Sequence, residues 1–195
     1  MSKKHTLSVL VENKPSVLAR VAGLFARRAF NIDSLAVGPT EDPALSRMTI
    51  VVDVKRLPLE QVTKQLNKLI NVIRIEELAP GESVQRQLLF VKVRADDSTR
   101  ANVLQIVSMF RARVIDVAVT TVTIESTGGD DKQNALLAAL APYGIKEIVR
   151  SGTVAIGRGE ESVSEQASQE WHAVVDSGDD ADAYSEFLSD PQAQV

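Results

Sequence analysis

One order of patterned segments occurs twice in the chain, and this repeat limits the folds that the chain can adopt. Residues 5–79 alternate between runs with an apolar residue at every second position and runs with apolar residues three and four apart. The order is β-α-β-β-α-β. After a short polar break at 80–83, the same order returns at about the same length over residues 85–159. We therefore predict an α+β protein with two tandem ferredoxin-like modules.

The boundaries of the expected elements follow from these two periods and from turn-forming residues. The first module is predicted to contain strand 5–12, helix 15–29, strands 32–40 and 46–54, helix 57–70 and strand 72–79. The second is predicted to contain strand 85–95, helix 98–111, strands within 113–127, helix 131–141 and strand 145–152. Pro15 fits the first turn of the first helix, because proline is tolerated where the backbone N–H has no helical partner.

Each module is close to the size at which a single core stabilises only marginally, since a domain of about 60 residues buries only ~60% of its unfolded surface. We therefore expect exposed sheet edges or faces to pair or pack with another protein surface. We expect a homodimer formed by joining such sheets, and pairing between the two modules of one chain is the competing arrangement.

The C-terminal residues 160–195 differ from the rest in charge. They hold 10 of the 26 acidic residues and none of the 22 lysines and arginines, so residues 1–159 carry 22 basic against 16 acidic residues. This composition is typical of a flexible acidic tail. Two apolar clusters at helical spacing leave open that the tail docks as short amphipathic helices. They are Trp171, Val174 and Val175, and Tyr184, Phe187 and Leu188.

Composition also limits the class of protein. No apolar run approaches the roughly 20 residues of a membrane span, and the N-terminal residues lack a secretory signal, so a soluble cytoplasmic protein is expected. Cysteine is absent, which excludes disulfides and thiolate chemistry. The basic residues are scattered, without a helix-turn-helix, zinc-finger or RNP-type pattern, so no nucleic-acid partner is predicted.

Groups able to perform catalysis are scarce. The chain has only two histidines, His5 and His172, and neither stands at metal-ligand spacing from another ligand. Both are interpreted as surface residues. No nucleotide-binding glycine motif is present, and Gly128 and Gly129 are interpreted as a loop before a helix. We therefore predict no catalytic residue, no metal site and no cofactor in this chain.

The most informative segment is residues 11–35, in which a strand passes through a tight loop into a helix. Backbone N–H groups at the start of a helix are unpaired and carry the positive end of its dipole. The carboxylate of an amino acid can therefore bind near Lys14 to Val17, with Asn13 adding a side-chain amide. In the alternative interpretation, Asn13 only caps the helix and Asn31 only tolerates an unusual backbone at its end.

The N-x-P-x-hydrophobic start of this helix, inside a β-α-β-β-α-β module, resembles the ACT domain, a regulatory fold that binds amino acids. The similarity extends through NIDSL and SRMTI to nearly the whole first module of the small subunits of acetohydroxyacid synthase, also called acetolactate synthase. The second module resembles the same family through FVKV, FRARVIDV and RSGTVAIGRG. Residues 5–159 are covered, and the acidic tail lies outside.

This resemblance implies a non-catalytic regulatory subunit that activates a large catalytic subunit and confers feedback inhibition by valine or a related branched-chain amino acid. Thiamine diphosphate, Mg and FAD are then expected in that partner. The effector should lie between two N-terminal modules. The residues implied are Asn13, Pro15, Ser16, Val17 and Leu18 of one chain and Asn31 and Ile32 of the other.

This chain departs from the family pattern at Ser16 and Ala29, where many members have glycine. A side chain at position 16 is expected to narrow the site or to add a hydroxyl contact. Two other classes remain open: a free-standing amino-acid-binding regulator of another enzyme or of transcription, and an enzyme in its own right. The first would need a DNA-reading element to act on transcription, and the second a set of catalytic groups.

Overall fold

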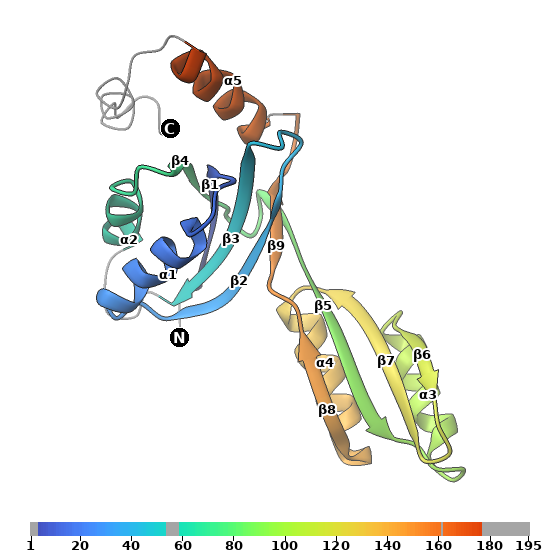
Figure 1. The fold of residues 1–195 in the computed structure, drawn as a ribbon. Coiled ribbons are helices and arrows are strands. Elements are labelled where there is room, and N and C mark those ends of the chain that lie inside the picture. Colours follow the sequence, from blue (N-terminus) through green and yellow to red (C-terminus); the bar gives the residue numbers. More distant parts are fainter. Residues whose placement is uncertain (1–3, 54–58, 161, 177–195) are drawn as a thin grey trace. The chain divides into compact units, whose positions relative to one another are not determined.

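A computed structural model describes residues 4–53, 59–160 and 162–176. The chain divides into two compact units (Figure 1). One consists of the residues up to Val84 together with those from Ala155 onward, and the other is Gln85–Val154. The division at residue 85 lies where the sequence predicts a second module, whereas residues 155–159, which we assigned to that module, belong to the first unit.

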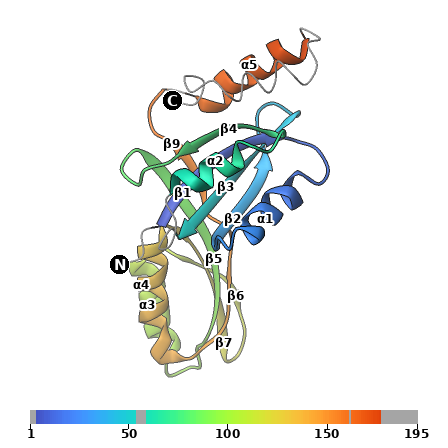
Figure 2. The same cartoon turned by 90° about the vertical axis from the view of Figure 1, so that its left-hand side faces the viewer.

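The N-terminal unit is built on a four-stranded antiparallel sheet with two helices on one side (Figure 2). Its elements are β1 (Lys4–Glu12), α1 (Val17–Arg27), β2 (Ile32–Pro39), β3 (Leu45–Asp53), α2 (Leu59–Leu66) and β4 (Val72–Glu77). The strand order is β2-β3-β1-β4, with β1 and β3 in the centre. The predicted β-α-β-β-α-β module is confirmed.

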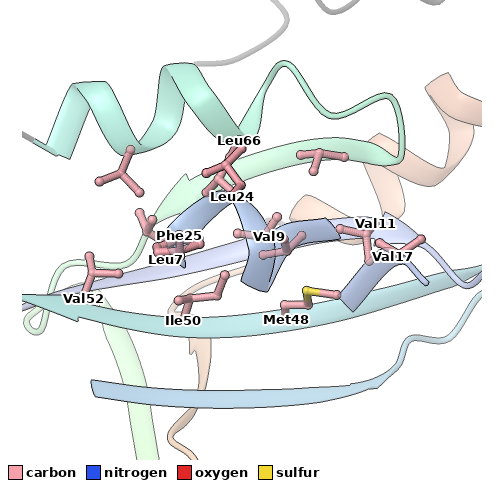
Figure 3. Close-up of a cluster of buried hydrophobic side chains, with 13 residues drawn as sticks. Leu7, Val9, Val11, Val17, Leu24, Phe25, Met48, Ile50, Val52 and Leu66 are labelled. Atoms are coloured by element: carbon pink, nitrogen blue, oxygen red, sulfur yellow. The ribbon is translucent and has the colours of Figure 1, made fainter. Parts of the chain in front are cut away.

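The core lies between this sheet and its two helices. Leu7, Val9 and Val11 alternate along β1 and are almost fully buried, as the period of two predicts (Figure 3). They contact the apolar side of α1, from which Phe25 and Leu24 point toward the sheet. The regular spacing of these side chains therefore fixes which side of the sheet the helices cover.

A further helix, α5 (Val163–Asp176), packs against part of the opposite face of the sheet. Leu10 alternates with Val9 and Val11, so it lies on this other face, where it clusters with Leu45 and Ile73. Ala167 and Trp171 of α5 pack onto these three residues, and Trp171 is only 8% exposed.

The tail is thus partly ordered. We expected flexibility from residue 160 onward, with docking of the Trp171 cluster as the alternative, and residues 163–176 form the docked helix. The physical reason is that one large aromatic side chain can be buried against a preformed apolar patch, although the segment around it is polar. The second cluster, around Phe187, lies outside the described residues.

The C-terminal unit repeats the topology of the first. It contains β5 (Ser83–Arg94), α3 (Arg100–Met109), β6 (Arg113–Val117), β7 (Thr121–Gly128), α4 (Asp130–Leu140), a 3-10 turn η1 (Ala141–Tyr143) and β8 (Ile145–Arg150). The strand order is β6-β7-β5-β8. A short strand that we did not predict, β9 (Val154–Gly157), pairs with β5 and belongs from Ala155 onward to the N-terminal unit. The two tandem ferredoxin-like modules are confirmed.

The first helix of each module ends in the same backbone motif. After α1, Ala29 has a φ of 56°, its N–H bonds the carbonyl of Ala26 at 3.2 Å, and the Phe30 N–H bonds Phe25 at 3.0 Å. These are the two hydrogen bonds of a Schellman cap. After α3, Arg111 has a φ of 50° and the Ala112 N–H bonds Val107 at 2.9 Å. Both caps use the left-handed conformation without glycine.

We predict that Ala29→Gly raises the free energy of unfolding by about 0.5–1 kcal/mol. The left-handed conformation costs a residue with a Cβ about 1–2 kcal/mol, of which the larger backbone entropy of unfolded glycine offsets about 0.5–1 kcal/mol. Urea denaturation measures the change. Ala26→Gly, at an exposed position with ordinary helical geometry, is the matched control and should lower stability by about 1 kcal/mol. Equal destabilisation by both would contradict the strain at Ala29.

Candidate functional site

Asn13 joins the loop between β1 and α1 to the loop between β2 and β3. Its backbone N–H donates to the carbonyl of Ala44 at 2.7 Å, and its side-chain Nδ2 donates to the carbonyl of Pro43 at 3.0 Å. Asn13 is therefore not the cap of α1, which corrects that alternative. The capping position is held by Ser16, whose side chain makes no capping hydrogen bond.

Helix α1 begins at Val17, two residues later than the predicted start at Pro15. The reason is the backbone of Ser16, which has φ 71° and ψ −7° and so turns the chain in a left-handed conformation before the helix. Val17 is buried at 4% exposure, and its neighbour Leu18 is 44% exposed. At the start of α1, one apolar side chain is therefore buried in the core and the next one is exposed to solvent.

The first turn of α1 has free hydrogen-bond donors. The first helical hydrogen bond joins the Arg20 N–H to the carbonyl of Ser16 at 3.0 Å. Among the residues that the structure describes, no backbone carbonyl accepts from the N–H of Leu18 or Ala19. The first turn also contains no acidic side chain that would neutralise the helix dipole. This end of α1 can therefore accept a carboxylate.

Lys14 attracts an anion to this loop less strongly than the sequence suggests, because its charge is paired. Its Nζ forms an ion pair with Oε1 of Glu12 at 2.8 Å. The other carboxylate oxygen of Glu12 accepts from Nδ2 of Asn71 at 2.5 Å, and Asn71 Oδ1 accepts from Arg20 at 3.3 Å. Because Glu12 balances the ammonium group, attraction for an anion comes chiefly from the backbone N–H groups.

The structure does not bring all the predicted effector residues together. Asn13, Lys14, Pro15, Ser16, Val17 and Leu18 form one group at the start of α1, whereas Asn31 and Ile32 follow its other end. Ile32 pairs with Val52 at the end of β3, and Asn13 bonds Ala44, just before β3 begins. These ends of a nine-residue strand are roughly 25–30 Å apart at about 3.3 Å per residue. One free amino acid cannot span this distance within one chain.

A well-formed cavity lies elsewhere in the N-terminal unit. It has a volume of about 540 Å³ and lies between the outer face of the N-terminal sheet and the segment leading into α5. Glu76, Glu77, Glu82 and Glu160 line it together with Arg47 and Arg158. Because carboxylates outnumber guanidinium groups there, the cavity is a poorer site for the carboxylate of an amino acid than the start of α1.

The two histidines lie apart from the loop and each pairs with an acid. His5 hydrogen-bonds Glu77, and its side chain is 11% exposed, so it is mostly covered and not the surface residue that we expected. His172 Nε2 lies 2.7 Å from Oδ2 of Asp42, with its side chain half exposed. Over residues 4–53, 59–160 and 162–176, no cluster of three potential metal-ligating side chains occurs, and no helix is long and apolar enough to cross a membrane.

Two features of the site escaped the sequence analysis. The carbonyls of Pro43 and Ala44 hold Asn13, although their segment was treated only as the connection between the predicted strands 32–40 and 46–54. Asp42, in the same turn, accepts hydrogen bonds from Ser168, the Ala44 N–H and His172, which lower the pKa of its carboxyl group. Asp42 is therefore ionised at neutral pH. The contacts of this turn with Asn13, Ser168 and His172 have no signal in local sequence, because they join segments far apart in the chain.

Comparisons with known proteins agree over both units. Residues 7–74 match a family model described as an acetohydroxyacid synthase (AHAS) small subunit-like ACT domain, and residues 86–159 match the model for the small subunit of acetolactate synthase. The chain is 60% identical over 155 residues to the acetolactate synthase small subunit of Mycolicibacterium smegmatis, covering 80% of this chain and 91% of that relative. A probable acetolactate synthase small subunit of Archaeoglobus fulgidus is 52% identical over 156 residues, 80% of this chain and 98% of the relative.

A solved structure shows the same relationship. The crystal structure of the acetolactate synthase small subunit from Thermotoga maritima is similar with a TM-score of 0.74 and 39% sequence identity. The similarity covers 82% of this chain and 99% of that one. Sequence and fold thus agree along almost the full length of these relatives, and the chain belongs to the family of acetolactate synthase small subunits.

Proposed function

We propose that this chain, as a regulatory subunit in branched-chain amino acid synthesis, raises the activity of the catalytic large subunit and confers feedback inhibition by valine or a related amino acid. The observation that carries the proposal is that backbone N–H groups in the first turn of α1, which follows the loop from Asn13 to Ser16, are available to a ligand in a chain of this family. An amino acid offers a carboxylate to such a site.

The site is proposed to be completed by a second copy of the chain. β2 is an edge strand of its sheet and can pair with β2 of another copy. In antiparallel pairing, Ile32 of one chain approaches Pro39 of the other, at the end of the sheet where Asn13 contacts the β2–β3 loop. A homodimer therefore brings Asn31 and Ile32 to the start of the partner's α1.

The large subunit is the proposed catalytic partner, and thiamine diphosphate, Mg and FAD are proposed to belong to it. Under this proposal the present chain binds the effector and regulates the activity of the large subunit, and it supplies no catalytic groups. A free-standing regulator would account for the N-terminal unit alone, whereas the match of residues 86–159 to the small-subunit model favours a role within this enzyme. The complex is proposed to act in the cytoplasm without nucleic acid or membrane.

We predict that the purified chain forms no acetolactate from pyruvate, that it increases the turnover of the large subunit, and that valine lowers the activity of the reconstituted enzyme. The measurement is acetolactate formation by the large subunit alone, by this chain alone and by the mixture, each with and without valine. Acetolactate formation by this chain alone would overturn the regulatory role. Equal rates with and without this chain would overturn activation.

We predict that Ser16→Asp abolishes inhibition by valine while activation persists. The new carboxylate repels the carboxylate of the effector at the helix start, and it interacts favourably with the helix dipole by roughly 0.3–1 kcal/mol. Aspartate also tolerates the left-handed backbone of position 16 better than most residues. A loss of about 2 kcal/mol in binding raises the inhibitory concentration of valine roughly 30-fold.

Ser16→Asn is the matched control for this substitution, because it has nearly the same shape and the same backbone tolerance without the charge. Valine titrations of the three reconstituted enzymes separate charge from size. Inhibition should persist in Ser16→Asn and disappear in Ser16→Asp. If Ser16→Asp were inhibited as strongly as the wild type, the effector would not bind at this loop.

A further inference from the structure

Helix α5 holds the β2–β3 loop through three side chains. Ser164 hydrogen-bonds the carboxylate of Glu41. Ser168 Oγ donates to Oδ2 of Asp42 at 2.6 Å, and His172 Nε2 lies 2.7 Å from the same oxygen. The spacing of these residues, at positions 164, 168 and 172, places all three on one side of the helix.

The apolar side of α5 provides the rest of the contact. Trp171 and Ala167 cover Leu10, Leu45 and Ile73, and the Trp171 ring also meets the His172 ring edge-on at 4.9 Å. An isolated helix of 14 residues is marginal in water. α5 therefore depends on this docking for its structure.

Asp42 connects α5 to the loop before α1. Its second carboxylate oxygen, Oδ1, accepts from the Ala44 N–H at 2.9 Å, and its carbonyl accepts from the Leu45 N–H at 3.0 Å. These bonds shape the turn whose next carbonyls, those of Pro43 and Ala44, hold Asn13. A short series of hydrogen bonds thus runs from Ser168 and His172 through Asp42 to Asn13.

The charge of Asp42 suits this role. Its side chain is only 14% exposed. The Ser168 hydroxyl, followed by the Ala44 N–H and His172, lowers the pKa of its carboxyl group. An ionised carboxylate accepts hydrogen bonds on both oxygens at once, so one oxygen can serve α5 while the other serves the turn.

We propose that α5 is a latch for the loop before α1: its docking fixes Asp42, and Asp42 positions Asn13 through the turn at Pro43 and Ala44. Docking of α5 and binding of the effector then favour each other, a consequence that rests on the proposed function. The matched family models end at residue 159, so this control is built from a segment beyond the shared family region.

The first test needs no effector. In the full-length chain, the double variant Ser168→Ala with His172→Ala removes both side-chain bonds to Asp42 and keeps Trp171, the chain's only tryptophan, as a fluorescent reporter of docking. Trp171→Ala removes the apolar contact instead. The matched control is Gln169→Ala, exposed on the same helix. Hydrogen exchange of the Asn13 and Leu45 N–H groups is measured in all of them.

We predict that exchange at Asn13 becomes faster by at least about fivefold in the double variant and in Trp171→Ala, and stays at the wild-type rate in Gln169→Ala. A rise in either of the first two variants, with none in the control, supports the latch. If Asn13 keeps its wild-type exchange rate in both, α5 does not hold the loop and the proposal is overturned.

The second test uses valine as the probe, with binding to the isolated chain measured by calorimetry. Release of α5 should weaken valine binding by at least about fivefold, and by reciprocity valine should shift the Trp171 emission of the wild type toward the docked form in mild urea. Wild-type affinity in a variant whose Trp171 emission shows release would overturn the link to the effector. If the wild type itself does not bind valine, the proposed function fails, while the exchange rate of Asn13 still decides the latch.

Discussion

The arrangement of the N-terminal unit depends on the pairing of β1 in the centre of its sheet. Because β1 pairs with β3 on one side and β4 on the other, its two rows of side chains are held on opposite faces. Leu7, Val9 and Val11 face the two helices, and Leu10 faces α5. A register shift of one residue would exchange the two rows, so α1 and α5 would both lose their apolar contacts.

The same strand also sets the place of the loop before α1. β1 ends at Glu12, whose N–H bonds the carbonyl of Asn71 at 2.9 Å, and the next residue, Asn13, bonds Ala44. The chain is therefore held on both sides as it leaves the sheet. With the backbone fixed there, the left-handed turn at Ser16 aims α1 back across the sheet, and among the described residues no backbone carbonyl accepts from the N–H groups of Leu18 and Ala19.

Periodicity in the sequence predicts the two modules well, because each strand and helix buries one regular face. Periodicity does not predict features that depend on an unusual backbone conformation or on a contact between residues far apart in the chain. The start of α1 was placed at Pro15, since the left-handed conformation of Ser16 leaves no trace in apolar spacing. Asn13 was offered as a helix cap because its partner, Pro43, is 30 residues away.

The tail is a second case in which local sequence does not reveal a contact with a distant part of the chain. Its composition is typical of disorder, and composition averages over residues that act individually. One tryptophan and three polar side chains at four-residue spacing are enough to hold α5 against the sheet. The receiving surface is formed by Leu10, Leu45 and Ile73 from three different strands, so it exists only after the sheet has folded.

A site built on backbone N–H groups leaves the choice of amino acid to the side chains around it. Every amino acid has the same α-carboxylate, so the start of α1 alone can bind amino acids in general but does not discriminate between them. In the proposed site, Leu18 is the exposed apolar residue beside the free N–H groups, and Ile32 of a second chain would lie opposite. Burying an apolar side chain between them contributes about 25 cal/mol per Å² of covered surface, whereas a polar side chain would lose its hydration there. Selection for a branched aliphatic effector would then come from two apolar residues contributed by different chains.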